Sequence, residues 1–381
     1  MQKRRILIAM LEIGDGHKSP ANALKKSIEK LYPKKYEITI LDLAQELGSK
    51  IFFNAYHTCW TKIGLNLPES MHIIYTLTNN KIAQRAERIL LLNLINKTKK
   101  YLIKQKPDLL ISTHYSMTHV LSRARRKLKI PLISINTDPF DSHQLWARKD
   151  VDKVITFSNR AHTQLLRKGV KENKLKIIKN SYILDHKHSL PTQNKQKLRK
   201  KLQLTNQPTI LMSAGAEGVS NLKLFVKKII QNNLDYQIIF ICARNKKLKK
   251  EIERISTKKS KTNLLVLGYV ENMHELIAAS DLVLGKPGAS QTFEVLSKNK
   301  PIIYTSCMIN EFPTLKFVTK NKIGWYTPTT KKFLQLLNKI GGNPEILIKI
   351  QEQIKNFKFR SCTPDLAKYI IKTFLKPTQE F

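Results

Sequence analysis

A glycine-rich turn near the amino terminus places a histidine shortly after an apolar run. Residues 6–11 read ILIAML and are soon followed by Gly14-Asp15-Gly16-His17. When such a turn follows a strand of a parallel sheet, backbone N–H groups and the positive end of the next helix lie close to a ligand. Imidazole titrates near neutral pH, so His17 is a candidate general base and Asp15 is a weaker one. The alternative is that His17 only completes the turn.

Two loops of small residues in the second half indicate a phosphate-binding pocket. The apolar run 208–213 leads into Ala214-Gly215-Ala216-Glu217-Gly218, and the run 281–285 leads into Lys286-Pro287-Gly288-Ala289. Small residues let a phosphate group approach the amino-terminal end of a helix. Glu294 follows in the same helical pattern, and its carboxylate can accept hydrogen bonds from the hydroxyl groups of a ribose. Together these loops predict a site for a nucleoside diphosphate.

Short β-branched runs alternate with helical patterns along the whole chain, which is typical of parallel sheets built from βαβ units. We expect strands at 5–11, 37–42, 108–113, 131–136, 152–157 and 174–179 in the first half, and at 208–213, 236–242, 263–267, 281–285, 300–305 and 323–327 in the second. Ser19 and Pro20 place the start of the first long helix at Ala21. The polar segment 186–205 is interpreted as a linker, in which His186 and His188 are expected to be solvated.

Composition limits the class of partner. The chain has 381 residues, with 68 Lys and Arg against 28 Asp and Glu, which gives a net charge of +40. This excess favours a polyanionic partner, either an anionic membrane or nucleic acid, although a compositional bias toward lysine would also produce it. No recognised nucleic-acid-binding motif occurs, so we expect no nucleic acid. The four cysteines form no C-x-x-C pair, and no apolar run is long enough to span a bilayer.

Residues 50–106 interrupt the alternation and are predicted to be an insertion, because a single crossover helix needs far fewer residues. The insertion has many apolar side chains, namely Ile51, Phe52, Phe53, Tyr56, Trp60, Met71, Ile73, Ile74 and Tyr75. Its basic side chains, together with a second basic cluster farther along, are Lys97, Lys99, Lys100, Lys104, Arg123, Arg125, Arg126, Lys127 and Lys129. Core packing is one interpretation of the apolar residues, and a membrane-facing surface is the other.

Several of these motifs together resemble a known family. They are G-x-G-H at residues 14–17, the strand followed by G-A-x-G at 215–218, GYVENM at 268–273, and K-P-G-x-x-x-x-x-E at 286–294. This set resembles glycosyltransferase family 28, nearest to its diacylglycerol glycosyltransferases, which include processive diacylglycerol glucosyltransferases and monogalactosyldiacylglycerol synthases. Residues 136–146 (NTDPFDSHQLW) resemble the same branch, which has T-D followed by H-x-x-W. The similarity covers roughly residues 4–375.

The resemblance implies an α/β protein with the GT-B fold, in which two Rossmann-like parallel-sheet domains face a central cleft. Residues 1–190 would form the domain that binds the lipid acceptor, and residues 200–381 would bind the UDP-sugar, with the final helix packing back on the first domain. The implied donor-binding residues are Gly215, Gly218, Tyr269, Val270, Gly288, Ala289, Glu294, Asn310 and Glu311. The implied acceptor-binding residues are Gly16, Asp138, His143 and Trp146. His114 and His119 either face the cleft or cap a helix.

The implied activity is an inverting transfer of a hexose from a UDP-sugar to diacylglycerol, or to a glycosyl-diacylglycerol, by a peripheral enzyme at the cytosolic membrane face. No cofactor or metal is expected, since the D-x-D pattern at Asp150-Val151-Asp152 directly precedes a strand. Three departures leave the donor sugar open, namely Ala289 for a second Gly, Gln291 for Thr, and the stretch CMINEFP at 307–313 for a later loop of the family that resembles P-G-Q-E-x-x-N-A and contacts the donor sugar. The alternatives are transfer of N-acetylglucosamine to a polyprenyl-linked peptidoglycan intermediate, a basic nucleic-acid-binding protein and, with less support, a sugar epimerase of the same fold.

Overall fold

Runs of leucine, isoleucine and valine form two six-stranded parallel sheets, one in each of two units of the chain. The computed structural model describes residues 3–12, 15–48, 54, 58, 68–191, 194–213, 221–255 and 261–375. One unit comprises Met1–His186, Met308–Asn310 and Ser361–Phe381, and the other comprises Lys187–Cys307 and Glu311–Arg360. All twelve strands expected from the sequence occur, each within two residues of its expected ends.

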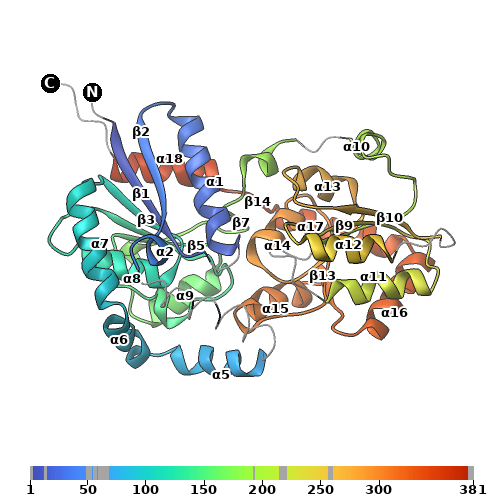
Figure 1. Cartoon of the computed structure of the whole chain (residues 1–381), viewed down its shortest axis with the longest axis horizontal. Helices are drawn as coiled ribbons and strands as arrows, with labels where there is room; N and C mark the ends of the chain where they lie inside the picture. Colours follow the sequence, from blue (N-terminus) through green and yellow to red (C-terminus); the bar gives the residue numbers. More distant parts are fainter. Residues whose placement is uncertain are drawn as a thin grey trace. The chain divides into compact units, whose positions relative to one another are not determined.

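The first sheet has the strand order β2-β1-β3-β4-β5-β6 (Figure 1). Its strands are β1 (Arg4–Met10), β2 (Tyr36–Asp42), β3 (Leu109–Ser112), β4 (Leu132–Ile135), β5 (Lys153–Thr156) and β6 (Leu175–Ile177). Helices α1 (Asp15–Leu31), α2 (Leu43–Glu46), α7 (Leu92–Gln105), α8 (Tyr115–Ala124) and α9 (Asn159–Arg167) belong to the same unit. The inner strands β1, β3, β4 and β5 are mostly buried, as expected for a parallel sheet covered on both faces, whereas the edge strands β2 and β6 are partly exposed. The last helix, α18 (Thr363–Phe374), packs against α1.

The second sheet has the order β10-β9-β8-β11-β12-β13. Its strands are β8 (Thr209–Ser213), β9 (Gln237–Ile241), β10 (Asn263–Leu267), β11 (Leu282–Gly285), β12 (Ile302–Tyr304) and β13 (Gly324–Tyr326). The helices of this unit are α10 (Lys195–Lys201), α11 (Leu222–Gln231), α12 (Lys246–Glu253), α13 (Met273–Ala279), α14 (Ala289–Leu296), α15 (Phe312–Lys320), α16 (Thr330–Gly342) and α17 (Glu345–Phe357). Its core is formed by side chains from both sheet and helices, such as Phe240 and Phe333.

Shorter elements complete the description. These are the 3-10 helices η2 (Gln144–Trp146), η3 (Glu172–Lys174), η4 (His186–Ser189) and η5 (Ile309–Glu311), and the short strands β7 (Ser181–Tyr182) and β14 (Arg360–Ser361), which pair with each other. In each large sheet the strand order reverses at one place, between β1 and β3 in the first and between β8 and β11 in the second. Ligands of open α/β sheets bind beside the carboxyl ends of the strands at such reversals. The loops that follow β1, β3, β8 and β11 are therefore where binding sites are expected.

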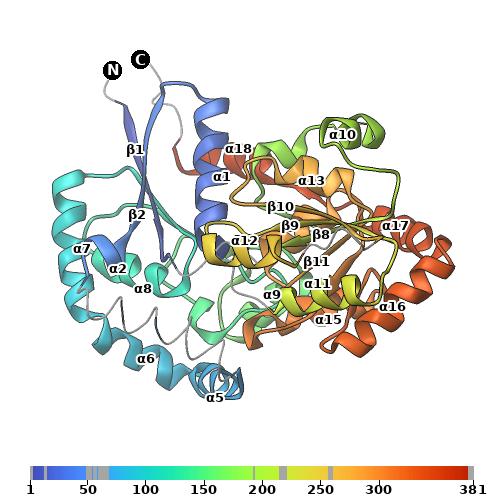
Figure 2. The same cartoon turned by 45° about the vertical axis from the view of Figure 1, so that its right-hand side comes forward.

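The insertion has two different parts. Helix α7 packs on the core through Leu94, Ile95 and Leu102, so this part agrees with the core interpretation. Helices α5 (Pro68–Thr78) and α6 (Lys81–Leu90) precede it and lie at the edge of their unit in both views (Figures 1 and 2). No residue of α6 is buried. The aromatic residues expected at 52, 53, 56 and 60 lie outside the described part of the chain.

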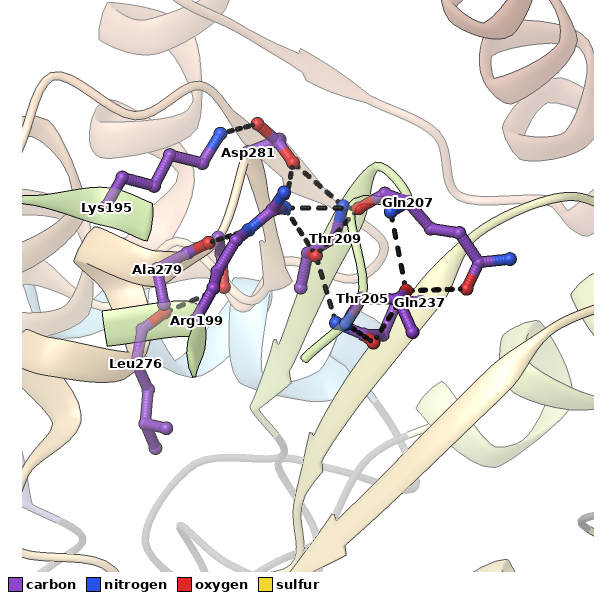
Figure 3. Close-up of polar contacts among 10 residues, drawn as sticks. Lys195, Arg199, Thr205, Gln207, Thr209, Gln237, Leu276, Ala279 and Asp281 are labelled. Carbon is purple, nitrogen blue, oxygen red and sulfur yellow. Dashed lines mark hydrogen bonds and ion pairs between the residues drawn. The ribbon is translucent and has the colours of Figure 1, made fainter. Parts of the chain in front are cut away.

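The described part of the segment expected to be a linker contains helices that its polar composition did not suggest. It contains α10, whose Lys195 and Arg199 form ion pairs with Asp281, just before β11 (Figure 3). Arg199 also donates to the hydroxyl of Thr209 and to the carbonyl of Ala279. Burial by itself would raise the pKa of Asp281, but these cations and the Thr209 N–H hold it below its usual value. Helix α10 is thereby fixed to the amino-terminal edge of the second sheet.

Candidate active site

His17 lies in the first turn of α1, which begins at Asp15 and not at Ala21 as the sequence suggested. The carbonyl oxygen of Thr113, directly after β3, lies 2.8 Å from its Nδ1 atom, and the Thr113 hydroxyl donates to the His17 carbonyl at 2.9 Å. A carbonyl can only accept, so Nδ1 carries the ring proton and Nε2 keeps its lone pair. Among the residues that the structure describes, none bonds to Nε2.

The electrostatic setting of His17 keeps its ring neutral. Burial lowers its pKa to about 4, although the bond to Thr113 acts in the opposite direction. The ring of His114 stands edge-on to it at 4.5 Å between centroids, and burial together with His17 lowers the pKa of His114 well below its usual value. The hydroxyl of Thr137, in the loop after β4, lies 2.9 Å from Nδ1. At physiological pH, His17 is thus an oriented, uncharged hydrogen-bond acceptor.

Asp15 and Gly16 are exposed at the start of α1. A Cβ atom added to Gly16 would meet nothing within 4 Å, so there is open space beside the backbone at this point. Pro20 lies inside the helix and has no N–H to donate to the Gly16 carbonyl four residues earlier. The backbone next to His17 is therefore accessible and lacks one helical hydrogen bond. Asp15 is the acidic residue of the first turn, and its negative charge suits the positive end of the helix.

Asp138 and Trp146 form a bonded pair in the loop after β4. The indole N–H of Trp146 donates to the Asp138 carboxylate at 2.7 Å. Trp146 is fully buried, whereas Asp138 is partly exposed. Burial raises the pKa of Asp138 to about 6, even though the Trp146 N–H favours the ionised form. Asp138 is thus the more accessible member of the pair, and the hydrogen bond from the buried Trp146 orients its carboxylate.

His143 has both ring nitrogens engaged. It caps η2 by accepting the N–H of Leu145 at 3.3 Å, and its Nε2 lies 3.0 Å from the carbonyl oxygen of Tyr75 on α5. Burial lowers its pKa. Tyr75 in turn donates to Asp141 at 3.0 Å. His143 thus joins α5 to the loop that presents Asp138, and a positioning role follows from these contacts.

Other histidines of this unit were left open by the sequence. His114 caps α8, because its Nδ1 accepts the N–H of Ser116 at 3.1 Å. His119 lies 2.9 Å from Glu87 of α6, and Glu87 also pairs with Arg148. No role was expected for Thr113 or Thr137, although Thr113 directly follows β3 and Thr137 lies two residues after β4, both at the carboxyl edge of the sheet. Their position after predicted strands was the signal that could have identified them as residues of the site.

In the second unit, Gly288 precedes α14 and Ala289 is its first residue. The Thr292 hydroxyl donates to the Gly288 carbonyl at 2.8 Å and lies 2.8 Å from the Tyr304 hydroxyl, and these contacts fix the first turn of the helix. The next residue on the exposed side is Glu294, whose carboxylate is largely but not wholly covered. A backbone amide end and a carboxylate on one helix can bind a phosphate and a ribose at the same time. Gly215 and Gly218, also expected here, lie outside the described residues.

The residues expected beside the uracil lie after β10. Tyr269 is exposed, and the Arg244 guanidinium stands 5.0 Å from its ring centre, a contact that the sequence did not suggest. Val270 is half-buried. Glu311, at the end of η5, pairs with Lys286 at 3.3 Å and lies 3.8 Å from the position of a Cβ on Gly288. Asn310 precedes it, and its side-chain oxygen is buried without a hydrogen-bond partner among the described residues.

No group of three or more metal-ligating side chains occurs among the residues that the structure describes. The D-x-D pair has structural contacts, because Asp152 accepts the N–H of Leu132 and pairs with Arg125, while Asp150 lies 3.9 Å from Arg123. Arg123 and Arg125 of the second basic cluster thereby form ion pairs within the protein.

Comparison with known sequences gives consistent matches in both halves. Residues 17–178 match the monogalactosyldiacylglycerol (MGDG) synthase family, and residues 209–307 match the glycosyltransferase family 28 C-terminal domain. A processive diacylglycerol beta-glucosyltransferase of Staphylococcus carnosus is 25% identical over 97% of this chain and 93% of its own length. A probable chloroplastic monogalactosyldiacylglycerol synthase of Nicotiana tabacum is 25% identical over 92% of this chain and 67% of its own.

Solved structures share the fold at low identity. MurG of Acinetobacter baumannii has a TM-score of 0.62 at 14% identity, covering 97% of this chain and 100% of that one. HepE of Anabaena, in complex with UDP and glucose, has a TM-score of 0.58 at 15% identity, with 97% and 99% covered. A UDP-GlcNAc 2-epimerase of Neisseria meningitidis has the same TM-score and identity, with 98% and 100% covered. These likenesses confirm the GT-B fold, and the fold alone does not separate transferases from epimerases.

Proposed function

We propose that this chain is a diacylglycerol glycosyltransferase of glycosyltransferase family 28, and that it transfers a hexose from a UDP-sugar to diacylglycerol with inversion at the anomeric carbon. The observation that carries the chemical part of the proposal is the state of His17. Its ring is neutral, its proton is fixed on Nδ1, and no described residue bonds to Nε2. An unprotonated ring with an accepting nitrogen is the state in which a histidine can take a proton as general base.

In the proposed step, the acceptor hydroxyl oxygen attacks the anomeric carbon of the sugar while the bond from that carbon to UDP breaks. His17 Nε2 takes the hydroxyl proton, and the electron pair of the broken bond leaves with UDP. Thr113 and Thr137 hold Nδ1 so that Nε2 stays in one place. A single displacement of this kind inverts the anomeric configuration and needs no covalent enzyme intermediate.

The leaving diphosphate needs stabilisation by the second unit. We assign this to the amino-terminal end of α14 at Gly288 and Ala289, where backbone N–H groups and the helix dipole favour negative charge. Glu294 would bind the ribose hydroxyls, Tyr269 and Val270 would lie beside the uracil, and Asn310 and Glu311 would meet the sugar. On this proposal the reaction needs neither a metal ion nor a cofactor.

The acceptor requires contact with a membrane, and α5 and α6 have the composition for it. Their exposed apolar side chains are Ile73, Ile74, Leu77, Ile82, Ile89 and Leu90. Lys81, Arg85 and Arg88 are exposed beside them. We call these nine residues the α5–α6 surface. A helix with one apolar face and adjacent cations lies in the interface of an anionic bilayer.

The same surface is close in structure to the acceptor residues of its own unit. Tyr75 of α5 donates to Asp141 and bonds through its carbonyl to His143, three and five residues beyond Asp138. No helix among the described residues is long and apolar enough to cross a bilayer. We propose a peripheral enzyme at the cytosolic face, anchored through the α5–α6 surface.

An activity assay tests the proposal. Vesicles that contain diacylglycerol and an anionic phospholipid are incubated with the protein and UDP-glucose, UDP-galactose or UDP-N-acetylglucosamine, and the lipids are analysed by mass. We expect a hexosyl-diacylglycerol with at least one of the two UDP-hexoses. Absence of glycolipid with all three donors, from protein that binds UDP, would contradict the proposal. A product only on an added polyprenyl-linked acceptor would favour the peptidoglycan alternative.

A further inference from the structure

The chain segment that joins the two sheets contacts the proposed nucleoside-binding elements of the second unit. Lys187 donates through Nζ to the carbonyl of Glu271 at 3.2 Å, in the loop that contains Tyr269. Three residues later, the carbonyl of Leu190 accepts from Lys298 Nζ at 3.0 Å. His188 is held between these two anchors.

His188 is buried, which is contrary to the solvated position expected from the sequence. Only 8% of its surface is exposed, whereas the side chain of the neighbouring His186 is 39% exposed and pairs with Asp185 at 3.0 Å. The Nε2 atom of His188 lies 3.7 Å from a carboxylate oxygen of Glu294 on α14. On another side its ring faces the ring of His274, at the start of α13, edge-on with 6.1 Å between centroids.

A glutamate that recognises a ribose must present its carboxylate in one orientation. Its side chain has several rotatable bonds, and ligand binding must otherwise supply the order that they lack. A ring N–H directed at one carboxylate oxygen restricts this freedom. Because His188 is itself buried and the chain is anchored on both sides of it, it is well placed to supply that restriction.

We propose that His188 is a positioning residue, which orients the Glu294 carboxylate toward the ribose hydroxyls of the UDP-sugar. The inference rests on the proposed function, since it takes Glu294 as the ribose ligand. If His188 has this role, the segment Lys187–Leu190 does more than connect the two sheets. This segment is part of the donor-recognition structure, although it makes no contact with the sugar nucleotide in the proposal.

Binding of UDP and of 2′-deoxy-UDP to the full-length protein, measured by calorimetry, tests this role. We expect the unmodified protein to bind UDP about 10-fold more tightly than 2′-deoxy-UDP, which is typical for loss of a hydrogen bond to a charged group. In His188→Ala this preference should fall to about threefold or less, while the Kd for 2′-deoxy-UDP changes by less than about twofold. The matched control is His186→Ala, which should behave as the unmodified protein.

Kinetics and a conservative pair of variants separate positioning from a general structural effect. In His188→Ala the KM for the UDP-hexose should rise and kcat should stay within about twofold. The amide nitrogen of a glutamine falls close to the place of Nε2, and that of an asparagine close to Nδ1, so His188→Gln should keep the ribose preference and His188→Asn should lose it. This pair also decides the matter if the alanine variant does not fold.

Equal weakening of UDP and 2′-deoxy-UDP in His188→Ala would overturn the inference, because it would mean a disturbed fold and not a misplaced carboxylate. An unchanged preference in that variant, or the same preference in His188→Gln and His188→Asn, would overturn it as well. These outcomes leave the proposed function standing. If the unmodified protein does not bind UDP at all, the proposed function fails and the inference fails with it.

Discussion

Replacing Trp146 by phenylalanine is expected to move the pH dependence of acceptor use. The indole N–H donates to Asp138 at 2.7 Å, and the pKa of Asp138 is about 6 with this bond in place. Phenylalanine fills most of the same volume but has no donor. The ionised form of Asp138 then loses a stabilising hydrogen bond, so its pKa must rise further.

The size of the effect follows from the energy of the bond. A hydrogen bond to a charged group contributes about 1.5–3 kcal/mol, and one pKa unit corresponds to about 1.36 kcal/mol. If the acceptor is bound by the carboxylate form, the acid limb of kcat/KM for diacylglycerol has its midpoint near pH 6 in the unmodified protein. In Trp146→Phe the midpoint should lie about one to two pH units higher.

The assay is a pH profile of kcat/KM for diacylglycerol between pH 5 and pH 9.5, at saturating UDP-hexose. The variant should lose activity at pH 7 and recover most of it at pH 9.5, because the carboxyl group ionises again. A control is Trp325→Phe, which changes a half-buried tryptophan in the other unit. An equal loss at every pH, or an unmoved midpoint, would refute the reasoning that Trp146 acts through Asp138.

Three further outcomes are expected. His17→Ala should abolish turnover and leave the thermal transition nearly unchanged. In the unmodified protein, kcat at saturating acceptor should decline only as the pH approaches 4, where the His17 ring becomes protonated. Glu87→Gln should lower the melting temperature by roughly 10 °C, since the variant removes the negative charge beside the buried guanidinium of Arg148, at a cost of about 3–5 kcal/mol. Exchange of Ile82 and Ile89 for serine, which removes two of the most exposed apolar side chains of α6, should weaken binding to anionic vesicles in sedimentation without changing UDP affinity.

The strands were predictable because their physical signal is local. Runs such as 208–213 combine β-branched residues with small residues at the end, and this pattern predicts a strand without knowledge of any distant contact. The start of α1 was predicted six residues too late. Pro20 suits a first helical turn, and the sequence did not show that the helix includes Gly16 and tolerates the missing hydrogen bond.

The side-chain contacts were less predictable, because many join residues far apart in the sequence. The bond between His17 and Thr113 spans 96 positions, and the contact of His188 with Glu294 depends on how the joining segment folds back on α14. Polar composition suggested a solvated segment, since composition reports average exposure and not the position of one side chain. The pair of Asp138 and Trp146 lies within one loop, and its motif was visible in the sequence.

The most direct test of the account is the structure of the product. The purified protein is incubated with diacylglycerol vesicles and the α-linked UDP-hexose that it accepts, and the anomeric configuration of the glycolipid is determined by NMR. The account predicts a β-linked hexosyl-diacylglycerol that does not form with His17→Ala. An α-linked product, or a β-linked product formed at an undiminished rate by His17→Ala, would contradict a single displacement with His17 as its base.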